Sequence, residues 1–188
     1  MDDNYYIKRV LAGDKNSFRH LVDKYQNMAY TVAYRILRHN ENSEEAMQEA
    51  FLKAYQSLSD FRLGAKFSTW LYRITFNSAI DIKRKMRTNI SSLDDDRQSI
   101  GEGIEHLTTE IDYAFDDENK FIKDAINKLP EIDSLLITLY HLHELKIKEI
   151  TKITGLKSSN IKTRLMRSRR EMRRYLERNL KTEIEELR

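Results

Sequence analysis

Apolar positions along the first part of the chain recur at the spacing of an amphipathic helix, with steps of three and one between Phe18 and Leu37. This periodicity predicts three helices, over residues 16–38, 44–58 and 68–87. Asp14 stands where an N-cap of the first helix is expected, and Ser43 where the second should begin. Glu44 and Glu45 would then lie in a first turn, where the helix dipole favours acids.

The same periodicity returns in the last third of the chain. Phe121 to Leu129 line one helix face, and Pro130 interrupts that helix because proline cannot continue its hydrogen-bond ladder. A further helix follows around Leu135 to Leu142. Two more periodic segments then come at 147–154 and 159–180, separated by Gly155.

The segment between these helical parts has no sustained period. It contains ten acids against one base over residues 91–119, together with Gly101 and Gly103. A long stretch of this composition inside one compact domain would be unusual, so we interpret it as a flexible acidic linker. The predicted fold is all-α, with two small helical domains at 1–90 and 119–188 joined by a linker at 91–118.

The composition limits the fold classes and the kinds of chemical site that the chain can form. The chain has one proline and five glycines in 188 residues, which favours long helices over sheets with many turns. It has no cysteine, which excludes disulfides, thiolate metal sites and a cysteine nucleophile. His141 and His143 are two residues apart and would point away from each other on a helix, so no metal is expected. We find no catalytic motif, signal peptide or membrane span, and expect a cytoplasmic, cofactor-free protein that is not an enzyme.

Charge is distributed unevenly although the net charge is only +3. Residues 146–178 contain twelve Lys or Arg against three Glu. A basic block of this kind suggests a polyanionic partner, although a solvated helix face would produce the same pattern.

Residues 147–165 have the spacing of a helix-turn-helix. Gly155 can adopt the positive φ that ends the first helix sharply, and Ser158 or Ser159 can cap the second helix. Ile150, Ile153, Ile161 and Leu165 are expected to form the shared core. Alanine often occupies the close crossing point of such motifs, and here that position holds Thr151, whose hydroxyl can bond back to a carbonyl.

On the second helix of this motif, the apolar and basic residues separate onto opposite faces. Thr163, Met166, Arg167, Arg170 and Arg174 fall opposite the predicted core. Arginine can read guanine edges in a major groove and methyl groups can contact thymine, so this face predicts DNA binding.

The first domain makes the prediction more specific. Residues 61–81, FRLGAKFSTWLYRITFNSAID, and the preceding 43–62, SEEAMQEAFLKAYQSLSDFR, resemble the promoter-melting domain of extracytoplasmic-function (ECF) sigma factors of the sigma-70 family. Residues 129–176 resemble the C-terminal domain of the same family, in the same order. The resemblance implies a factor that binds core RNA polymerase, recognises the −35 and −10 promoter elements and melts the −10 element.

The resemblance implies three sets of contact residues. Those facing the polymerase clamp are Glu45, Gln48 and Glu49, which share one helix face at i, i+3 and i+4. Those at the −10 element are Arg62, Lys66, Phe67, Ser68, Arg73, Lys83, Arg84 and Arg87. Those at the −35 element are Ser159, Asn160, Lys162, Thr163, Met166, Arg167 and Arg170.

Some of these residues also have purely structural interpretations. Phe67 can belong to the core instead of facing an opened base, and Trp70 is expected in the core. Asn77 and Asp81 share the face of Trp70, and we interpret them as structural groups, which need hydrogen-bond partners if they are buried.

Two other functions remain open at this stage. A stand-alone helix-turn-helix regulator would bind a palindromic site tightly as a dimer without polymerase. A helical adaptor would bind only protein and show no DNA-dependent activity.

The predicted partners are core RNA polymerase and promoter DNA. Members of the family are commonly held inactive by an anti-sigma factor, but no residue identifies such a partner here.

Overall fold

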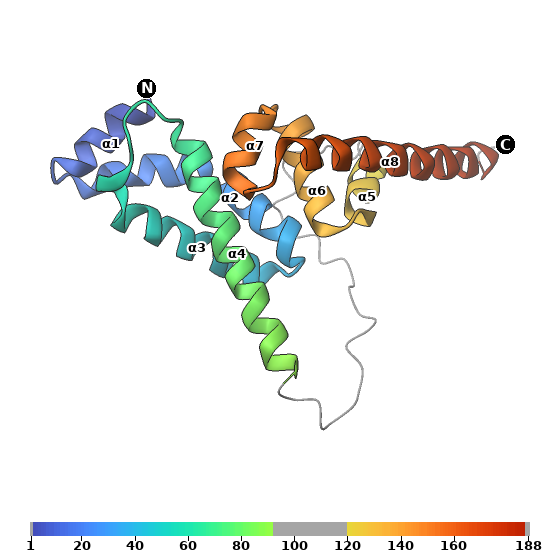
Figure 1. The fold of residues 1–188 in the computed structure, drawn as a ribbon, viewed down its shortest axis with the longest axis horizontal. Coiled ribbons are helices and arrows are strands. Elements are labelled where there is room, and N and C mark those ends of the chain that lie inside the picture. Colours follow the sequence, from blue (N-terminus) through green and yellow to red (C-terminus); the bar gives the residue numbers. More distant parts are fainter. Residues whose placement is uncertain (1, 92–119, 187–188) are drawn as a thin grey trace.

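The computed structural model describes residues 2–91 and 120–186, which are organised mainly in helices (Figure 1). The α-helices are α1 Asp3–Leu11, α2 Phe18–Leu37, α3 Asn40–Gln56, α4 Phe67–Ser91, α5 Lys120–Lys128, α6 Glu131–Ile137, α7 Ile147–Thr154 and α8 Ser158–Glu186. Short 3₁₀ turns lie at Lys15–Ser17 and Leu58–Asp60, and a π-helical turn at Thr138–Leu142 follows α6. The segment 92–119, predicted to be a flexible acidic linker, lies outside the described residues. The all-α prediction is confirmed.

In the first domain, α2, α3 and α4 pack against one another and α1 packs on α2. Their apolar stripes meet in a core that includes Leu21, Phe51 and Leu71, and small residues such as Ala79 allow the helices to approach closely. The periodicity of the sequence is thus explained by three helices sharing one interior.

The predicted start of α3 is wrong by about one turn. The helix begins at Asn40, and the side chain of His39 caps it by accepting a hydrogen bond from the Asn42 backbone N–H at 3.5 Å. Ser43 is fully buried inside the helix, and its hydroxyl donates to the His39 carbonyl at 2.6 Å. Because a histidine cap lacks the sequence signature of Ser or Asp, the pattern pointed to the next serine instead.

In the second domain, α6 and α8 pack together, α5 packs on α8, and α7 and α8 form the predicted helix-turn-helix. Gly155 ends α7 with φ of 72°, in the left-handed region. Ile150, Ile153, Ile161 and Leu165 are all buried, as predicted. The hydroxyl of Thr151 donates back to the Ile147 carbonyl at 2.9 Å, which satisfies it without disturbing the helix crossing.

The two domains contact each other through helices that the sequence did not pair. α7 packs on α4 and α6 packs on α2, so the buried residues of both domains form one continuous cluster (Figure 1). Along the edge of this interface, Arg35 Nη1 donates to Asn127 Oδ1 at 2.6 Å. Arg38 uses both terminal nitrogens, one on the Asn127 carbonyl and one on the Leu129 carbonyl at 2.6 Å.

None of the helices within the described ranges is long and apolar enough to cross a bilayer.

Gly155 provides a test of the helix-turn-helix. Nothing lies within 4 Å of a Cβ built at this position, so substitution changes only the backbone energy. We expect Gly155→Ala to lower the free energy of unfolding of the second domain by about 1–2 kcal/mol, because alanine disfavours positive φ. Urea titration followed by circular dichroism measures this. Gly155→Asn should cost less, since asparagine tolerates the left-handed region. Equal stability of the alanine variant and the wild type would contradict the proposed turn.

Candidate nucleic-acid interface

The start of α8 presents the predicted −35 residues to solvent. Ser159, Asn160, Lys162, Thr163, Met166, Arg167 and Arg170 are all exposed. Met166 is 53% exposed, which is unusual for a large apolar side chain and suits contact with a thymine methyl group. The opposite face carries the buried Ile161 and Leu165, so burial orients the basic face outward.

Arg164 anchors this helix and was not singled out from the sequence. Its Nη1 forms an ion pair with the Asp133 carboxylate of α6 at 2.8 Å, and its Nε donates to Asn160 Oδ1 at 3.0 Å. Asn160 therefore has one acceptor occupied within the protein. The i, i+4 spacing of Asn160 and Arg164 was a usable signal, but the partner on α6 was not visible in the sequence.

The predicted −10 loop is an exposed turn over a buried aromatic cluster. Residues 62–66 are all exposed, and the Ala65 N–H donates to the Arg62 carbonyl at 3.1 Å across Gly64, whose φ is 109°. Leu63 is 51% exposed within this turn. Backbone polar groups and an apolar side chain are thus available to a base that leaves a duplex.

Phe67 requires a correction. Its side chain is only 2% exposed, and its ring contacts those of Tyr25, Phe61 and Trp70 at centroid distances of 5.6, 5.7 and 5.7 Å. A base could not stack on this ring without opening the core. We therefore assign Phe67 to the support of the loop. Trp70 packs on the same core while remaining partly exposed, in line with its predicted place.

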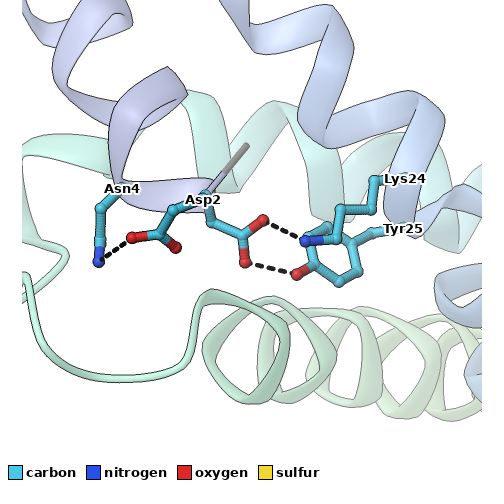
Figure 2. Close-up of polar contacts among 5 residues, drawn as sticks. Asp2, Asn4, Lys24 and Tyr25 are labelled. Atoms are coloured by element: carbon cyan, nitrogen blue, oxygen red, sulfur yellow. Dashed lines mark hydrogen bonds and ion pairs between the residues drawn. The ribbon is translucent and has the colours of Figure 1, made fainter.

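Helix α1 fixes one side of this aromatic cluster. The Tyr25 hydroxyl and the Lys24 ammonium donate to the two oxygens of the Asp3 carboxylate at 2.5 and 2.6 Å (Figure 2). Burial, followed by the hydrogen bond to Asp3, raises the pKa of Tyr25 to about 12. The sequence did not reveal this tie, because it joins groups about twenty residues apart.

Helix α4 carries the remaining predicted −10 residues. Arg73, Arg84 and Arg87 are exposed and Ser68 is half-buried. Asn77 and Asp81 are also exposed, so neither is a buried group that needs a hydrogen-bond partner. Asp81 lies 3.7 Å from Arg84 in a loose surface ion pair. The exposed amide of Asn77 therefore belongs with the solvent-facing groups of α4. Its position beside Trp70 on the helical wheel did not indicate this exposure.

Two of the predicted −10 cations are bound by the second domain. Lys66 Nζ lies 2.7 Å from Glu149 Oε1 on α7, and Lys83 Nζ lies 2.6 Å from Glu131 Oε1 on α6. The hydrogen bond from Lys66 lowers the pKa of Glu149. Neither pair could be predicted from the sequence, because each joins the two domains.

The predicted polymerase-facing residues lie on α3. Glu45 and Gln48 are exposed, and Glu49 forms an ion pair with Lys53 at 2.9 Å. Leu52 was not singled out, yet it is 56% exposed and lies three residues after Glu49 on the same helix face. The face therefore combines acids with an exposed apolar side chain, a composition common at protein interfaces.

Comparison with known proteins gives consistent results over both domains. Residues 21–88 match the family model for Sigma-70 region 2, and residues 122–172 match that for Sigma-70, region 4. The chain is 33% identical over 179 residues to the ECF RNA polymerase sigma factor SigW of Bacillus subtilis (strain 168), covering 90% of this chain and 94% of that protein. It is 30% identical over 175 residues to the ECF RNA polymerase sigma-E factor of Haemophilus influenzae, covering 90% and 92% respectively.

Two solved structures share the fold. CnrH in complex with the cytosolic domain of CnrY superposes with a TM-score of 0.63 at 18% identity, covering 93% of this chain and 97% of that one. The sigma factor RpoE in complex with the anti-sigma factor NepR from Bartonella quintana gives a TM-score of 0.66 at 20% identity, covering 85% and 96%.

The tie between Tyr25 and Asp3 is testable. We expect Tyr25→Phe to lower the free energy of unfolding by about 1.5–3 kcal/mol, because it removes a hydrogen bond to a charged group. Urea titration measures the change. Tyr55→Phe is a matched control, since Tyr55 is half-buried against Phe18 and has no resolved tie to a carboxylate in the described structure.

The same tie has a pH signature. Because the pKa of Tyr25 is raised from 10.0 to about 12, its stabilising effect is complete below pH 10 and lost as pH rises toward 12. The wild type should therefore lose more stability than Tyr25→Phe over this range. Parallel pH profiles of the two proteins would contradict the assignment.

Proposed function

The chain belongs to the sigma-70 family as an ECF sigma factor, and from that premise we propose how its residues divide the work of starting transcription. A sigma factor directs core RNA polymerase to promoters, and this is the function of the chain. The division into domains at 1–90 and 119–188, and every individual contact below, is our proposal.

The observation that carries the function is the succession of region 2 and region 4 on one chain. A stand-alone regulator or a protein-binding adaptor would need only one of them. The pairing of a melting domain with a helix-turn-helix explains why the chain has both an exposed loop over an aromatic cluster and an exposed basic helix.

In the proposed −35 contact, the start of α8 enters the major groove. Arg167 and Arg170 are exposed on the outward face, where arginine can bond to guanine, and Met166 can contact a thymine methyl group. Lys162 and the more C-terminal Arg174 would reach phosphates. The Arg164–Asp133 ion pair supports this role by holding the helix on α6.

In the proposed −10 contact, the loop 62–66 receives a base from the opened duplex. Backbone groups of the turn and the exposed side chain of Leu63 would surround it, with Phe67 and its aromatic neighbours as a rigid floor. Arg73, Arg84 and Arg87 on α4 would hold the phosphates of the strands nearby. We add Asn77 to this set because it is exposed among these arginines.

In the proposed polymerase contact, α3 docks on the clamp helices through Glu45, Gln48 and Glu49, with Leu52 at the centre of the contact. An exposed leucine that follows two acids on the same helix face suits a basic surface with an apolar part. The polymerase would supply the catalytic metals. Binding energy alone would account for the work of this chain, which we propose acts in the cytoplasm and is not an enzyme.

We also propose that an anti-sigma factor regulates the chain, since the sigma factor RpoE, which shares its fold, forms a complex with the anti-sigma factor NepR. An apolar cleft of about 400 Å³ in the second domain offers a place for an apolar segment of such a partner. Its lining includes Ile122, Ile126, Met172 and Leu176, with Arg169 and Arg173 among the residues around it.

Run-off transcription tests the function directly. Purified chain and core RNA polymerase are incubated with a library of duplex promoters, and the start sites are sequenced. Initiation from a shared pair of elements at fixed spacing is expected, and its complete absence would overturn the proposed function.

The −35 contact predicts the effect of Arg167→Ala. We expect it to weaken binding of the selected −35 element by about 1–3 kcal/mol and to relax base preference at one position. Arg169→Ala is the matched control, because the Arg169 guanidinium lies 5.8 Å from the Tyr140 ring on the other side of the helix. Promoter selection that is identical in the two variants would contradict the placement of α8.

The polymerase contact predicts the effect of Glu45→Lys. Reversing an exposed charge opposite a basic surface should weaken core-polymerase binding by roughly tenfold, mainly through slower association. Asp60→Lys carries the same charge change at another exposed position of the first domain. Surface plasmon resonance on immobilised core enzyme measures both, and equal affinities would remove α3 from the interface.

A further inference from the structure

The contacts between the two domains use groups that promoter binding also needs. Lys66 and Lys83 are predicted to hold DNA at the −10 element, yet each is ion-paired with a glutamate of the second domain. Lys83 also donates to the Ile36 carbonyl at 3.3 Å, so its ammonium is held from two sides. The carboxylate beside each ammonium repels a phosphate that approaches the same cation, so each ion pair competes with DNA for the lysine.

The two glutamates are positioned by their own helices. Glu131 opens α6 and Glu149 lies in the first turn of α7, where the helix dipole favours a carboxylate. Glu149 Oε2 accepts from the Lys146 backbone N–H at 2.9 Å, which leaves Oε1 for Lys66. Glu149 therefore presents a fixed oxygen toward the first domain, and Glu131 reaches Lys83 from the first turn of α6, each as a phosphate of bound DNA would.

Apart from the apolar packing of α7 on α4 and of α6 on α2, the remaining polar contacts of the interface add little to its stability. Arg35 and Arg38 donate to neutral oxygens of Asn127 and Leu129, and Arg35 Nε has no acceptor among the described residues. Burial of a guanidinium without a carboxylate is costly, and the two arginines repel each other. The two ion pairs are also partly exposed, which leaves them open to screening by salt.

We propose that the arrangement in Figure 1 is a self-blocked state, in which Glu131 and Glu149 occupy the −10 cations until DNA phosphates replace them. This inference rests on the proposed function, since it assumes that Lys66 and Lys83 bind DNA. It assigns to the second domain a regulatory role besides −35 recognition. The packing of α7 on α4 places the block directly over the helix that carries the other −10 residues.

The test removes the two carboxylate charges and measures domain separation. The chain has no cysteine, so cysteines at the exposed Lys8 of α1 and Lys152 of α7 can carry spin labels without competition. In this background, Glu131→Gln with Glu149→Gln keeps both side-chain shapes and an oxygen that can accept from the Lys146 N–H. Pulsed dipolar spectroscopy on the free chain then reports the distance between the domains.

A matched control keeps the same net charge. Glu144 and Glu171 are exposed residues of the second domain, and Glu144→Gln with Glu171→Gln also removes two negative charges. All variants are titrated with a fluorescent random-sequence forked duplex of about 30 base pairs, without polymerase. This probe detects release of the −10 cations without knowledge of the promoter.

The expected result has two parts. The double variant at Glu131 and Glu149 shows a longer, broader distance distribution than the control, and binds the fork more tightly by up to about tenfold. Unchanged separation, or fork binding no tighter than that of the control, overturns the proposal. If the variant misfolds, the labelled wild type with salt provides the decision, since screening should lengthen the distance and an unresponsive distance overturns the proposal.

Failure of this proposal and failure of the proposed function give different results. The distance measurement uses neither polymerase nor DNA, whereas the proposed function is judged by run-off transcription. If the chain starts transcription but its domains stay together when the two carboxylates are removed, the proposed function stands and the proposed self-blocked state is refuted. A chain that opens but never starts transcription refutes the function.

Discussion

The packing of α4 between α2 and α3 is the contact on which the rest of the first domain depends. Leu71 and Ala79 are completely buried in this packing and Ile82 nearly so. Because that face is fixed in the core, Arg73, Arg84 and Arg87 are directed toward solvent by the packing of the helix. The loop 62–66 is fixed in the same way, since Phe61 before it and Phe67 after it are both held in the core.

In the second domain, a shorter motif directs the charged side chains toward solvent in the same way. Burial of Ile161 and Leu165 orients α8, and the Arg164–Asp133 ion pair holds the start of that helix against α6. The exposed arginines then face solvent in one direction. In both domains the apolar face does the positioning, and the charged face is left for a partner.

Charge explains how the two domains meet. The first domain presents cations that need anions, and before DNA is bound the nearest ones are Glu131, Glu149 and the carbonyls at the end of α5. Carbonyls at a helix C-terminus carry partial negative charge and attract arginine. The polar part of the interface therefore consists of groups that stand in for a polyanion, beside the apolar packing of α7 on α4 and of α6 on α2.

The sequence by itself determined the helical class, the helix-turn-helix with Gly155 at its turn, the outward basic face of α8 and the family, because each depends on residues close together in the chain. Helix α1 was not predicted because it has only nine residues, and a histidine cap concealed the start of α3. Only the tertiary structure decided that Phe67 is core, that Asn77 and Asp81 are exposed, and that Leu52 stands out from α3. It alone joined Lys66 to Glu149 and Lys83 to Glu131, because helical periodicity says which face of a helix is apolar but not which distant segment will cover it.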